Sequence, residues 1–170
     1  MKRPPFVLAF LALTLASACA ADVPTGSQTA AESGTVDAGA NEAIEATLDT
    51  YFEAVSRMDL ELFLTIWADP GDVSVVSPVG RLQSLEDLEG FFQGMRDTYS
   101  EIELRRSNVS IRTQGTTAWV AFDFEVDGVA ADGSPVVFSG WETQVQRNTG
   151  DGWRIAHVHY SVPAAAPAAQ

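Results

Sequence analysis

The chain has 170 residues, with 23 acidic and 10 basic side chains and a formal net charge of −13, so it has room for one ordinary domain with short extensions. Its single lysine, Lys2, lies in an N-terminal stretch with the features of a removable signal, and a lysine-free mature chain excludes Schiff-base lysines and lysine-dependent phosphate loops. Because an acidic surface repels polyphosphates, no nucleic-acid partner is expected.

Residues 1–18 have the pattern of a secretory signal peptide: a basic start followed by an apolar run from Phe6 to Leu15. That run has about ten residues, and a helix needs about 20 to span a bilayer. The sequence Ala16-Ser17-Ala18-Cys19 resembles a bacterial lipobox, and Ala16 and Ala18 also fit an ordinary cleavage site. We therefore expect export to the cell envelope, periplasm or outer surface, with Cys19 either lipidated, as the only contact with a membrane, or removed, which leaves a secreted protein.

The remaining chain divides by composition into three parts. Residues 19–40 are rich in Gly, Ser, Thr and Ala and lack apolar periodicity, which predicts a flexible tether. Residues 41–163 carry the periodic segments and predict one folded domain. Residues 164–170 are low in complexity and predict a disordered tail.

Three helices are expected in the first half of the domain. Apolar residues three and four apart predict a first helix from about Asn41, with Ile44, Leu48, Tyr51 and Val55 on one face. A second helix follows Asp59 and ends before the Asp69-Pro70-Gly71 turn, and residues 73–76 predict a short strand. Ser84 to Asp87 form a capping box that begins a third helix.

Four strand-like runs follow, and short turns suited to hairpins connect them. In the first run the apolar positions change from even to odd numbers, which predicts a β-bulge near 105–108. The expected class is α+β: three N-terminal helices packed in a curved, mainly antiparallel sheet that encloses a cone-shaped cavity. The four predicted strands are residues 101–112, 117–129, 136–147 and 153–162.

Several short sequence motifs resemble those of the SnoaL-like, nuclear transport factor 2-like superfamily over roughly residues 41–163. These are Asp69-Pro70-Gly71, Glu142-Thr143-Gln144-Val145 and the run from Asp151 to Ser161, and they are most similar to the association domain of calcium/calmodulin-dependent protein kinase II. The resemblance implies a cystatin-like cone and a homodimer or higher oligomer formed through the outer sheet face.

The kinase association domain carries pocket arginines at three positions that are not arginine in this chain. Ala121, Gln144 and Tyr160 stand there instead. We therefore expect no pocket built for a small carboxylate and no kinase-like role.

His157 and His159 are the only histidines and lie two apart on a predicted strand, so both are expected on one face with Trp153 and Ile155. Two ring nitrogens can transfer protons, and they can equally be structural groups that bond neighbouring strands. No third ligand is marked by spacing, so neither a metal site nor a cofactor is expected.

Asp123 is the candidate general base. If the mixed face of its strand lines the cone, Asp123 is a carboxylate beside Trp119 in an apolar pocket, where desolvation raises its pKa. If the apolar face is the core, Asp123 is solvated. Glu142 has the same two alternatives.

Large side chains with polar tips are candidates for binding a ligand in the cone. The preferred function is binding of a small, largely apolar molecule by a self-associating exported domain. The alternatives are a lyase or isomerase of the polyketide cyclase or ketosteroid isomerase type, using Asp123 and a histidine, and a structural oligomerisation module with a filled cone. The candidate ligand-binding residues are Tyr51, Trp67, Trp119, Glu142, Gln144 and Tyr160.

Overall fold

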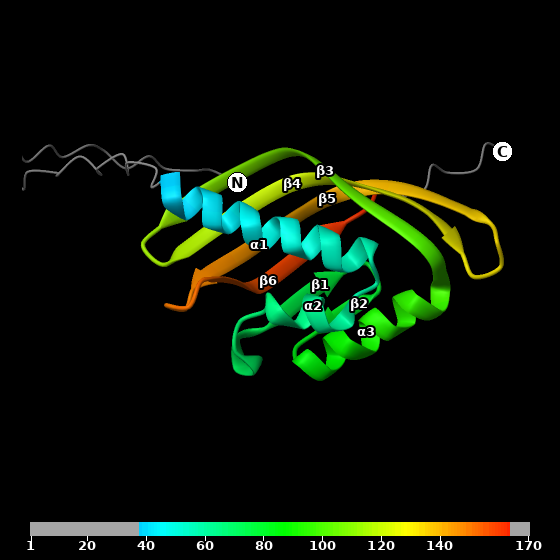
Figure 1. The fold of residues 1–170 in the computed structure, drawn as a ribbon, viewed down its shortest axis with the longest axis horizontal. Helices are drawn as coiled ribbons and strands as arrows, with labels where there is room; N and C mark the ends of the chain where they lie inside the picture. The colour runs from blue at the N-terminus through cyan, green and yellow to red at the C-terminus, as the bar shows by residue number, and fades with distance from the viewer. Residues whose placement is uncertain (1–37, 164–170) are drawn as a thin grey trace, which may run out of the picture. The chain divides into compact units, whose positions relative to one another are not determined.

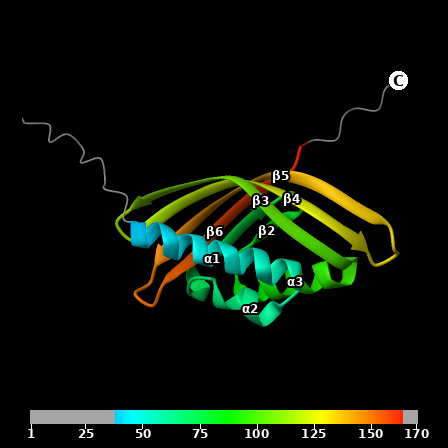
Figure 2. The ribbon, with the colours of Figure 1, turned by 45° about the horizontal axis from the view of Figure 1, so that its top comes forward.

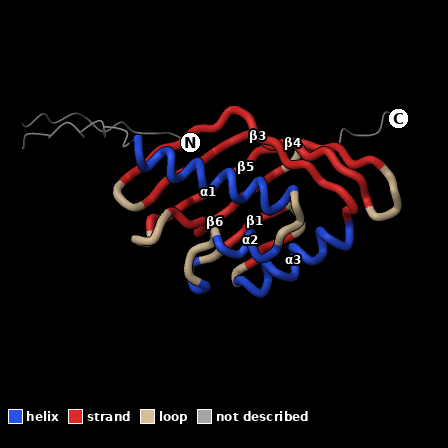
Figure 3. The backbone as a smooth tube through the Cα atoms, viewed as in Figure 1, coloured by secondary structure: helices blue, strands red, loops and turns tan. Residues whose placement is uncertain are grey.

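Three helices lie against one face of a six-stranded sheet in the computed structural model, which describes residues 38–163 (Figure 1). The predicted signal peptide with Cys19, most of the predicted tether and the predicted tail lie outside the described residues. Figures 2 and 3 show the same arrangement: the sheet curves over the helices, and its other face carries none of the described helices. The predicted α+β class is confirmed.

The second and third helices begin where a side chain accepts a hydrogen bond from one of their free N–H groups. Helix α1 spans Ala38–Ser56 and starts before the predicted position, so residues 38–40 are helical rather than tether. Helix α2 (Leu60–Thr65) is capped by Asp59, whose carboxylate accepts from the Leu62 N–H at 3.0 Å. Helix α3 (Leu85–Thr98) starts at the predicted capping box, where Ser84 Oγ accepts from the Asp87 N–H.

The sheet has the order β2-β1-β6-β5-β4-β3, and only the β1–β6 pair is parallel. The predicted short strand is β1 (Ser74–Ser77), which a 3₁₀ turn at Pro70–Asp72 precedes. Strand β2 (Gly80–Leu82) was not predicted, because its three residues carry no alternation. The four long strands match the predicted runs: β3 Tyr99–Gln114, β4 Thr117–Ala130, β5 Pro135–Asn148 and β6 Trp153–Ser161.

Two irregularities decide which side chains face the helices. The β3–β4 register shifts between Ser107 and Ser110, with Asn108 at φ 54°, which confirms the predicted bulge. A second shift, not predicted, lies in the β5–β6 pair. Gln146 pairs with Ile155 and Val145 with His157, so Ala156 is an extra residue on β6.

The second bulge overturns one expectation about the histidines. Trp153 and Ile155 are buried on the inner face, and after Ala156 the inward positions continue at Val158. His157 and His159 therefore share a face with each other, as expected, but they lie on the outer face, opposite Trp153 and Ile155. One inserted residue reverses the alternation because strand side chains repeat every two residues.

Strand β4 turns its apolar face toward the helices. Its side chains Val120, Phe122, Phe124 and Val126 are at most 4% exposed and pack with α1 residues such as Leu48 and Phe52. The mixed face with Asp123 is therefore the outer one. A second core cluster joins α2 and α3 to β1 and β6 around Phe63, Phe92 and Ile155.

Strand β5 has the opposite polarity. Its polar side chains Glu142, Gln144 and Gln146 point inward and are at most 5% exposed, whereas Val137 and Trp141 point outward and are 76% and 56% exposed. Direct pairing of Phe122 with Glu142 across β4 and β5 places both residues on the inner face.

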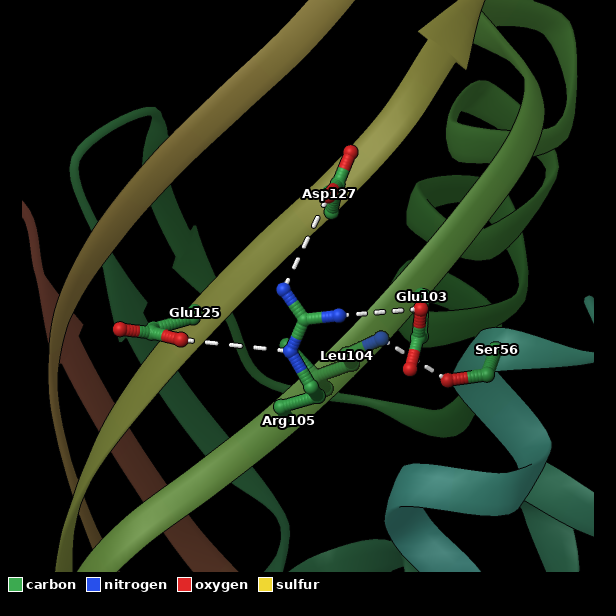
Figure 4. A network of polar contacts seen from close by, with 6 residues as sticks. All are labelled: Ser56, Glu103, Leu104, Arg105, Glu125 and Asp127. Carbon is green, nitrogen blue, oxygen red and sulfur yellow. Dashed lines mark hydrogen bonds and ion pairs between the residues drawn. The ribbon is translucent and has the colours of Figure 1, made fainter.

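Strand β3 forms the sheet edge and is tied to the helices on one side and to β4 on the other. The Leu104 N–H donates to Ser56 Oγ at the end of α1, at 2.9 Å (Figure 4). On the outer face, the Arg105 guanidinium lies 3.0 Å from Glu103 and within 4.0 Å of Glu125 and Asp127. The Ser56 contact thus occupies one backbone N–H group of the edge strand.

Within residues 38–163, no helix has the length and apolar character needed to cross a bilayer.

Candidate functional site

A cavity of about 420 Å³ lies between the inner sheet face and the helices. Its walls are mainly aliphatic and aromatic, and such a volume suits a small organic molecule. Val79, which is 79% exposed in the β1–β2 turn, lies at its rim. The lining residues come from all three helices, from the β1–β2 turn and from strands β3 to β6, and are Tyr51, Val55, Phe63, Val79, Phe91, Gly94, Met95, Thr98, Tyr99, Ile102, Leu104, Phe124, Val126, Phe138, Glu142 and Tyr160.

Glu142 is the one carboxyl group among the described residues that line this cavity. Its Oε2 accepts a hydrogen bond of 3.3 Å from the Tyr51 hydroxyl, and its Oε1 accepts one of 2.9 Å from Gln144 Nε2. Tyr51 belongs to α1 and Glu142 to β5, so the packing of the helix on the sheet brings the pair together. Each carboxyl oxygen therefore has one donor.

Burial dominates the acid–base properties of the pair. Loss of water raises the pKa of Glu142 from 4.5 to about 7, although the hydrogen bonds from Gln144 and Tyr51 act in the opposite direction. Burial also raises the pKa of Tyr51 well above 10, and the nearby Glu142 and Tyr160 raise it further. At neutral pH the site thus holds a carboxyl group near its midpoint beside a phenol that keeps its proton.

The hydrogen bonds at the Glu142 carboxyl extend to two buried glutamine side chains. Gln146 Nε2 donates to Gln144 Oε1 at 3.1 Å, and Gln144 in turn donates to Glu142. Both glutamine side chains are fully buried. Among buried side-chain atoms of the described residues, Gln146 Oε1 and Trp67 Nε1 have no hydrogen-bond partner, and both residues pair with Ile155.

Tyr160 supplies a further hydroxyl to the cavity wall. Burial raises its pKa, and a hydrogen bond with Ser77 acts against that increase. Tyr160 lies opposite Glu142 in the β5–β6 register, and its ring packs edge-on against Phe124. Tyr99, at the start of β3, adds a third phenol to the lining.

The three residues expected to carry catalysis lie away from this cavity. Asp123 is on the outer face of β4, where its Oδ2 accepts from Asn108 Nδ2 at 2.6 Å. His157 is half-buried on the outer face, with its Nδ1 2.7 Å from Ser74 Oγ, and His159 is exposed. Burial and the neighbouring His159 lower the pKa of His157. The described lining includes neither histidine nor Asp123.

The six candidate ligand-binding residues divide into four groups. Tyr51, Glu142 and Tyr160 line the cavity, and Gln144 contacts it only through Glu142. Trp67 is packed edge-on against Phe63 in the core, at 6% exposed. Trp119 is 44% exposed on the outer sheet face. Ala121, one of the three positions compared with the kinase pocket, is also exposed on that face.

Sequence reasoning missed the residues that give the cavity its apolar walls. Phe91, Met95 and Tyr99 come from one side of α3 and its junction with β3, and Ile102 and Leu104 from the even positions before the β3 bulge. Periodicity separates inward-facing from outward-facing positions, but inward-facing residues in the core and at a cavity have the same spacing. Gln146 was missed, although it continues the two-residue spacing of Glu142 and Gln144 on the inner face of β5.

Within residues 38–163, no group of three or more potential ligands is arranged to hold a metal ion. The polar side chains in the described lining of the cavity are Glu142, Thr98 and the three tyrosines Tyr51, Tyr99 and Tyr160. A carboxyl group near its midpoint accepts or donates a proton at neutral pH, and a phenol donates a hydrogen bond to a carbonyl or hydroxyl oxygen.

The comparisons with known proteins identify the fold. The model of the SnoaL-like domain family matches residues 44–165. A nuclear transport factor 2-like superfamily protein from Salmonella enterica serovar Typhimurium is 26% identical, with a TM-score of 0.71 over 78% of this chain and 96% of that one. Curated protein sequences gave no match.

Two other solved structures share the fold at lower identity. A ketosteroid isomerase-like protein from Erwinia carotovora atroseptica is 19% identical, with a TM-score of 0.62 over 72% of this chain and 95% of that one. A candidate scytalone dehydratase from Novosphingobium aromaticivorans is 13% identical, with a TM-score of 0.67 over 73% and 84%. At these identities the likeness concerns the fold, which hosts unrelated functions.

Proposed function

The chain belongs to the SnoaL-like domain family, and we propose that it binds a small, neutral, largely apolar molecule in its cavity. The observation that carries this proposal is the lining itself: apolar walls around about 420 Å³, with polar groups confined to Glu142 and a few hydroxyls. A bound molecule would place one carbonyl or hydroxyl group toward Glu142 and Tyr51, and its apolar part against the walls.

The charges around the cavity support a neutral ligand. The described lining contains no arginine, lysine or histidine, and Glu142 is its one carboxyl group. An anionic ligand would face Glu142 without a compensating cation and would lose its hydration.

A cavity-filling variant tests the binding site. An added Cβ at Gly94 meets no atom within 4 Å, and Gly94 lines the cavity. We expect Gly94→Leu to fill part of the cavity and to weaken binding of the neutral naphthalene ketone Prodan at least about ten-fold, as measured by its fluorescence. Gly90→Leu is the matched control, since Gly90 lies on the same helix with equal free space but outside the lining. Equal affinity of both variants would refute the site.

Ligand charge is tested by competition. At pH 8, 2-acetylnaphthalene should displace Prodan at least about ten-fold more strongly than 2-naphthoate, since the two compounds share a ring system and differ in charge. Stronger displacement by the carboxylate would contradict a neutral ligand.

A second candidate function is proton transfer to and from the bound molecule, and the raised pKa of Glu142 favours it. In such a reaction the Glu142 carboxylate takes a proton from a carbon next to a carbonyl, Tyr51 turns its hydroxyl proton from Glu142 to the carbonyl oxygen, and Glu142 returns the proton it took. The expected reaction class is isomerisation or lyase chemistry. Exchange of the methyl protons of 2-acetylnaphthalene in D₂O, followed by NMR, should occur with the native protein and not with Glu142→Gln. Equal exchange rates would exclude this role.

We also propose that the domain self-associates through its outer sheet face, as the motifs shared with the kinase association domain imply. Trp119 and Trp141 are exposed on that face, and its carboxylates Glu125 and Asp127 lie toward the β3 edge around Arg105. Native mass spectrometry should give a dimer or larger assembly for the native chain and a monomer for Trp141→Glu. Gly90→Glu, on the opposite side of the sheet, is the control.

Export and lipidation are proposed from the sequence of residues 1–19 alone. Metabolic labelling with a palmitate analogue should label the native protein and not Cys19→Ser. An unlabelled native protein would exclude the lipid anchor.

A further inference from the structure

Glu142, Gln144 and Gln146 form a column of polar side chains on the inner face of β5, which we call the amide column. The three side chains are 5%, 0% and 0% exposed. A polar group that is buried this deeply is costly unless it is hydrogen-bonded. Their partners therefore decide what the column does.

The neighbouring strands offer the amide column few polar partners. On β4 the residues paired with its members are Phe122, Val120 and Ala118. On β6 they are Tyr160, Val158 and Ile155. Because both flanks are mainly apolar, the column's hydrogen bonds run along the strand from one member to the next, and α1 adds the hydroxyl of Tyr51 at the Glu142 end.

The hydrogen bonds of the column all point in one direction. Gln146 donates to Gln144, and Gln144 donates to Glu142. With the opposite amide orientation, Gln144 Oε1 would face Glu142 Oε1, which places two acceptors together when the carboxyl is ionised. The observed orientation suits the carboxylate form of Glu142.

Gln146 controls which end of the Gln144 amide faces Glu142. Its Nε2 bonds to Gln144 Oε1, so the Gln144 amide group must turn its own Nε2 toward the carboxylate. Gln146 Oε1, at the far end, has no partner among the described residues. An unsatisfied buried acceptor is disfavoured in a stable core unless it serves a purpose, and here the donor group of the same amide is directed toward Gln144, which in turn donates to Glu142.

We propose that Gln144 and Gln146 are positioning residues for Glu142: Gln146 fixes the orientation of the Gln144 amide, and Gln144 holds the carboxylate in the cavity wall. The inference extends the proposed function by assigning a supporting role to two residues that do not line the cavity. The titratable groups that face Glu142 are Tyr51 on α1 and Tyr160 on β6. Both are phenols that stay protonated at neutral pH. A change in the Glu142 midpoint after substitution of an amide therefore reports the effect of that amide.

The test is a carboxyl titration of the ligand-free protein by ¹³C NMR, with the Glu142 signal assigned by its absence in Glu142→Gln. We expect Gln144→Met to raise the Glu142 midpoint by about one pH unit, since a donor to the carboxylate is lost. This lowers the ionised fraction at pH 7 about five-fold. Gln146→Met should raise the midpoint by a smaller amount. Thr143→Val, on the outer face of the same strand, should leave it unchanged.

The double variant distinguishes action through Gln144 from an independent effect. If Gln146 acts only through Gln144, the Gln144→Met/Gln146→Met protein has the same midpoint as Gln144→Met alone. Additive increases, or an unchanged midpoint in both single variants, would overturn the proposal.

A measurement on the native protein covers the case in which these variants do not fold. The side-chain ¹⁵N signals of Gln144 and Gln146 should titrate with the same midpoint as the Glu142 carboxyl carbon. Amide signals that do not follow Glu142 would also overturn the proposal. Since no ligand is present in either titration, failure of ligand binding and failure of the amide column give separate results.

Discussion

The hydroxyl of Tyr51 donates to Oε2 of Glu142 at 3.3 Å, although the two residues are 91 positions apart in the chain. The contact joins α1 to the inner face of β5 and places a phenol beside the cavity's carboxyl group. Replacing Tyr51 removes one of the two hydrogen bonds that stabilise the Glu142 carboxylate.

Tyr51→Phe should raise the pKa of Glu142 above about 7, because the lost hydrogen bond stabilises the carboxylate. The increase should be smaller than that caused by Gln144→Met, since Gln144 has the larger effect on this group. The carboxyl carbon titration measures both. Tyr99→Phe is the control, as Tyr99 lines the cavity but is not among the groups that shift the pKa of Glu142. A decrease in the Tyr51→Phe midpoint would contradict the arrangement.

Glu142 should make the folded protein less stable as pH rises. Its folded-state pKa of about 7 lies above the ordinary value of 4.5, so between these values the folded chain binds more protons than the unfolded chain. The free energy of unfolding therefore falls as pH rises through this window, by about 3 kcal/mol in total, and then levels off.

Urea unfolding of the native protein and of Glu142→Gln at several pH values measures this effect. The difference in unfolding free energy between the two proteins should change by about 3 kcal/mol between pH 4.5 and pH 8. Other titrating groups, such as Asp87 and His157, cancel in the difference. A constant difference would show that Glu142 is not buried as described.

His159→Gln should raise the pKa of His157 only partly toward its ordinary value. Burial is the larger cause of the lowered pKa of His157, and the charge of His159 is the smaller one. NMR of the imidazole ring protons across a pH titration gives the midpoint directly. Complete return to 6.5 would mean that burial on the outer face has no effect on His157.

Gly140→Ala should destabilise the protein by about 1 to 3 kcal/mol. A Cβ at this position would lie 2.1 Å from the carbonyl oxygen of Ser161 and 2.8 Å from Cζ of Phe124, so β5, β6 or the aromatic ring must move. Gly90→Ala, at an exposed position of helix α3 with open space around it, should instead stabilise by about 0.5 to 1 kcal/mol. Chemical denaturation of both variants measures their changes in unfolding free energy. If Gly140→Ala is not destabilised, the packing around Gly140 is looser than described.

Much of the fold was predictable because its signals are local. The helix periodicity around Leu48 and the capping box at Ser84 each depend on a few neighbouring residues, and the structure confirms both. The bulge in β3 was predictable for the same reason, since a change of alternation is visible in one strand. Strand β2 was missed because three residues are too few to show a pattern.

The candidate site was less predictable, and Asp123 and Glu142 show why. Both lie on strands with alternating polarity, yet Asp123 faces outward and Glu142 inward. Alternation divides a strand into two faces without saying which of them meets the helices. That choice is made by register: the pairing of Phe122 with Glu142 places the polar side of β5 beside the apolar side of β4.

The sequence by itself determined the α+β class, the order of most elements and the acidic, lysine-poor composition that excludes whole classes of chemistry. Only the tertiary structure decided the site. One extra residue at Ala156 moved the histidines to the outer face, and α1 brought Tyr51 to Glu142. The reason is physical: a carboxyl group's pKa and partners depend on what surrounds it in space, and neighbours 91 positions apart leave no local pattern.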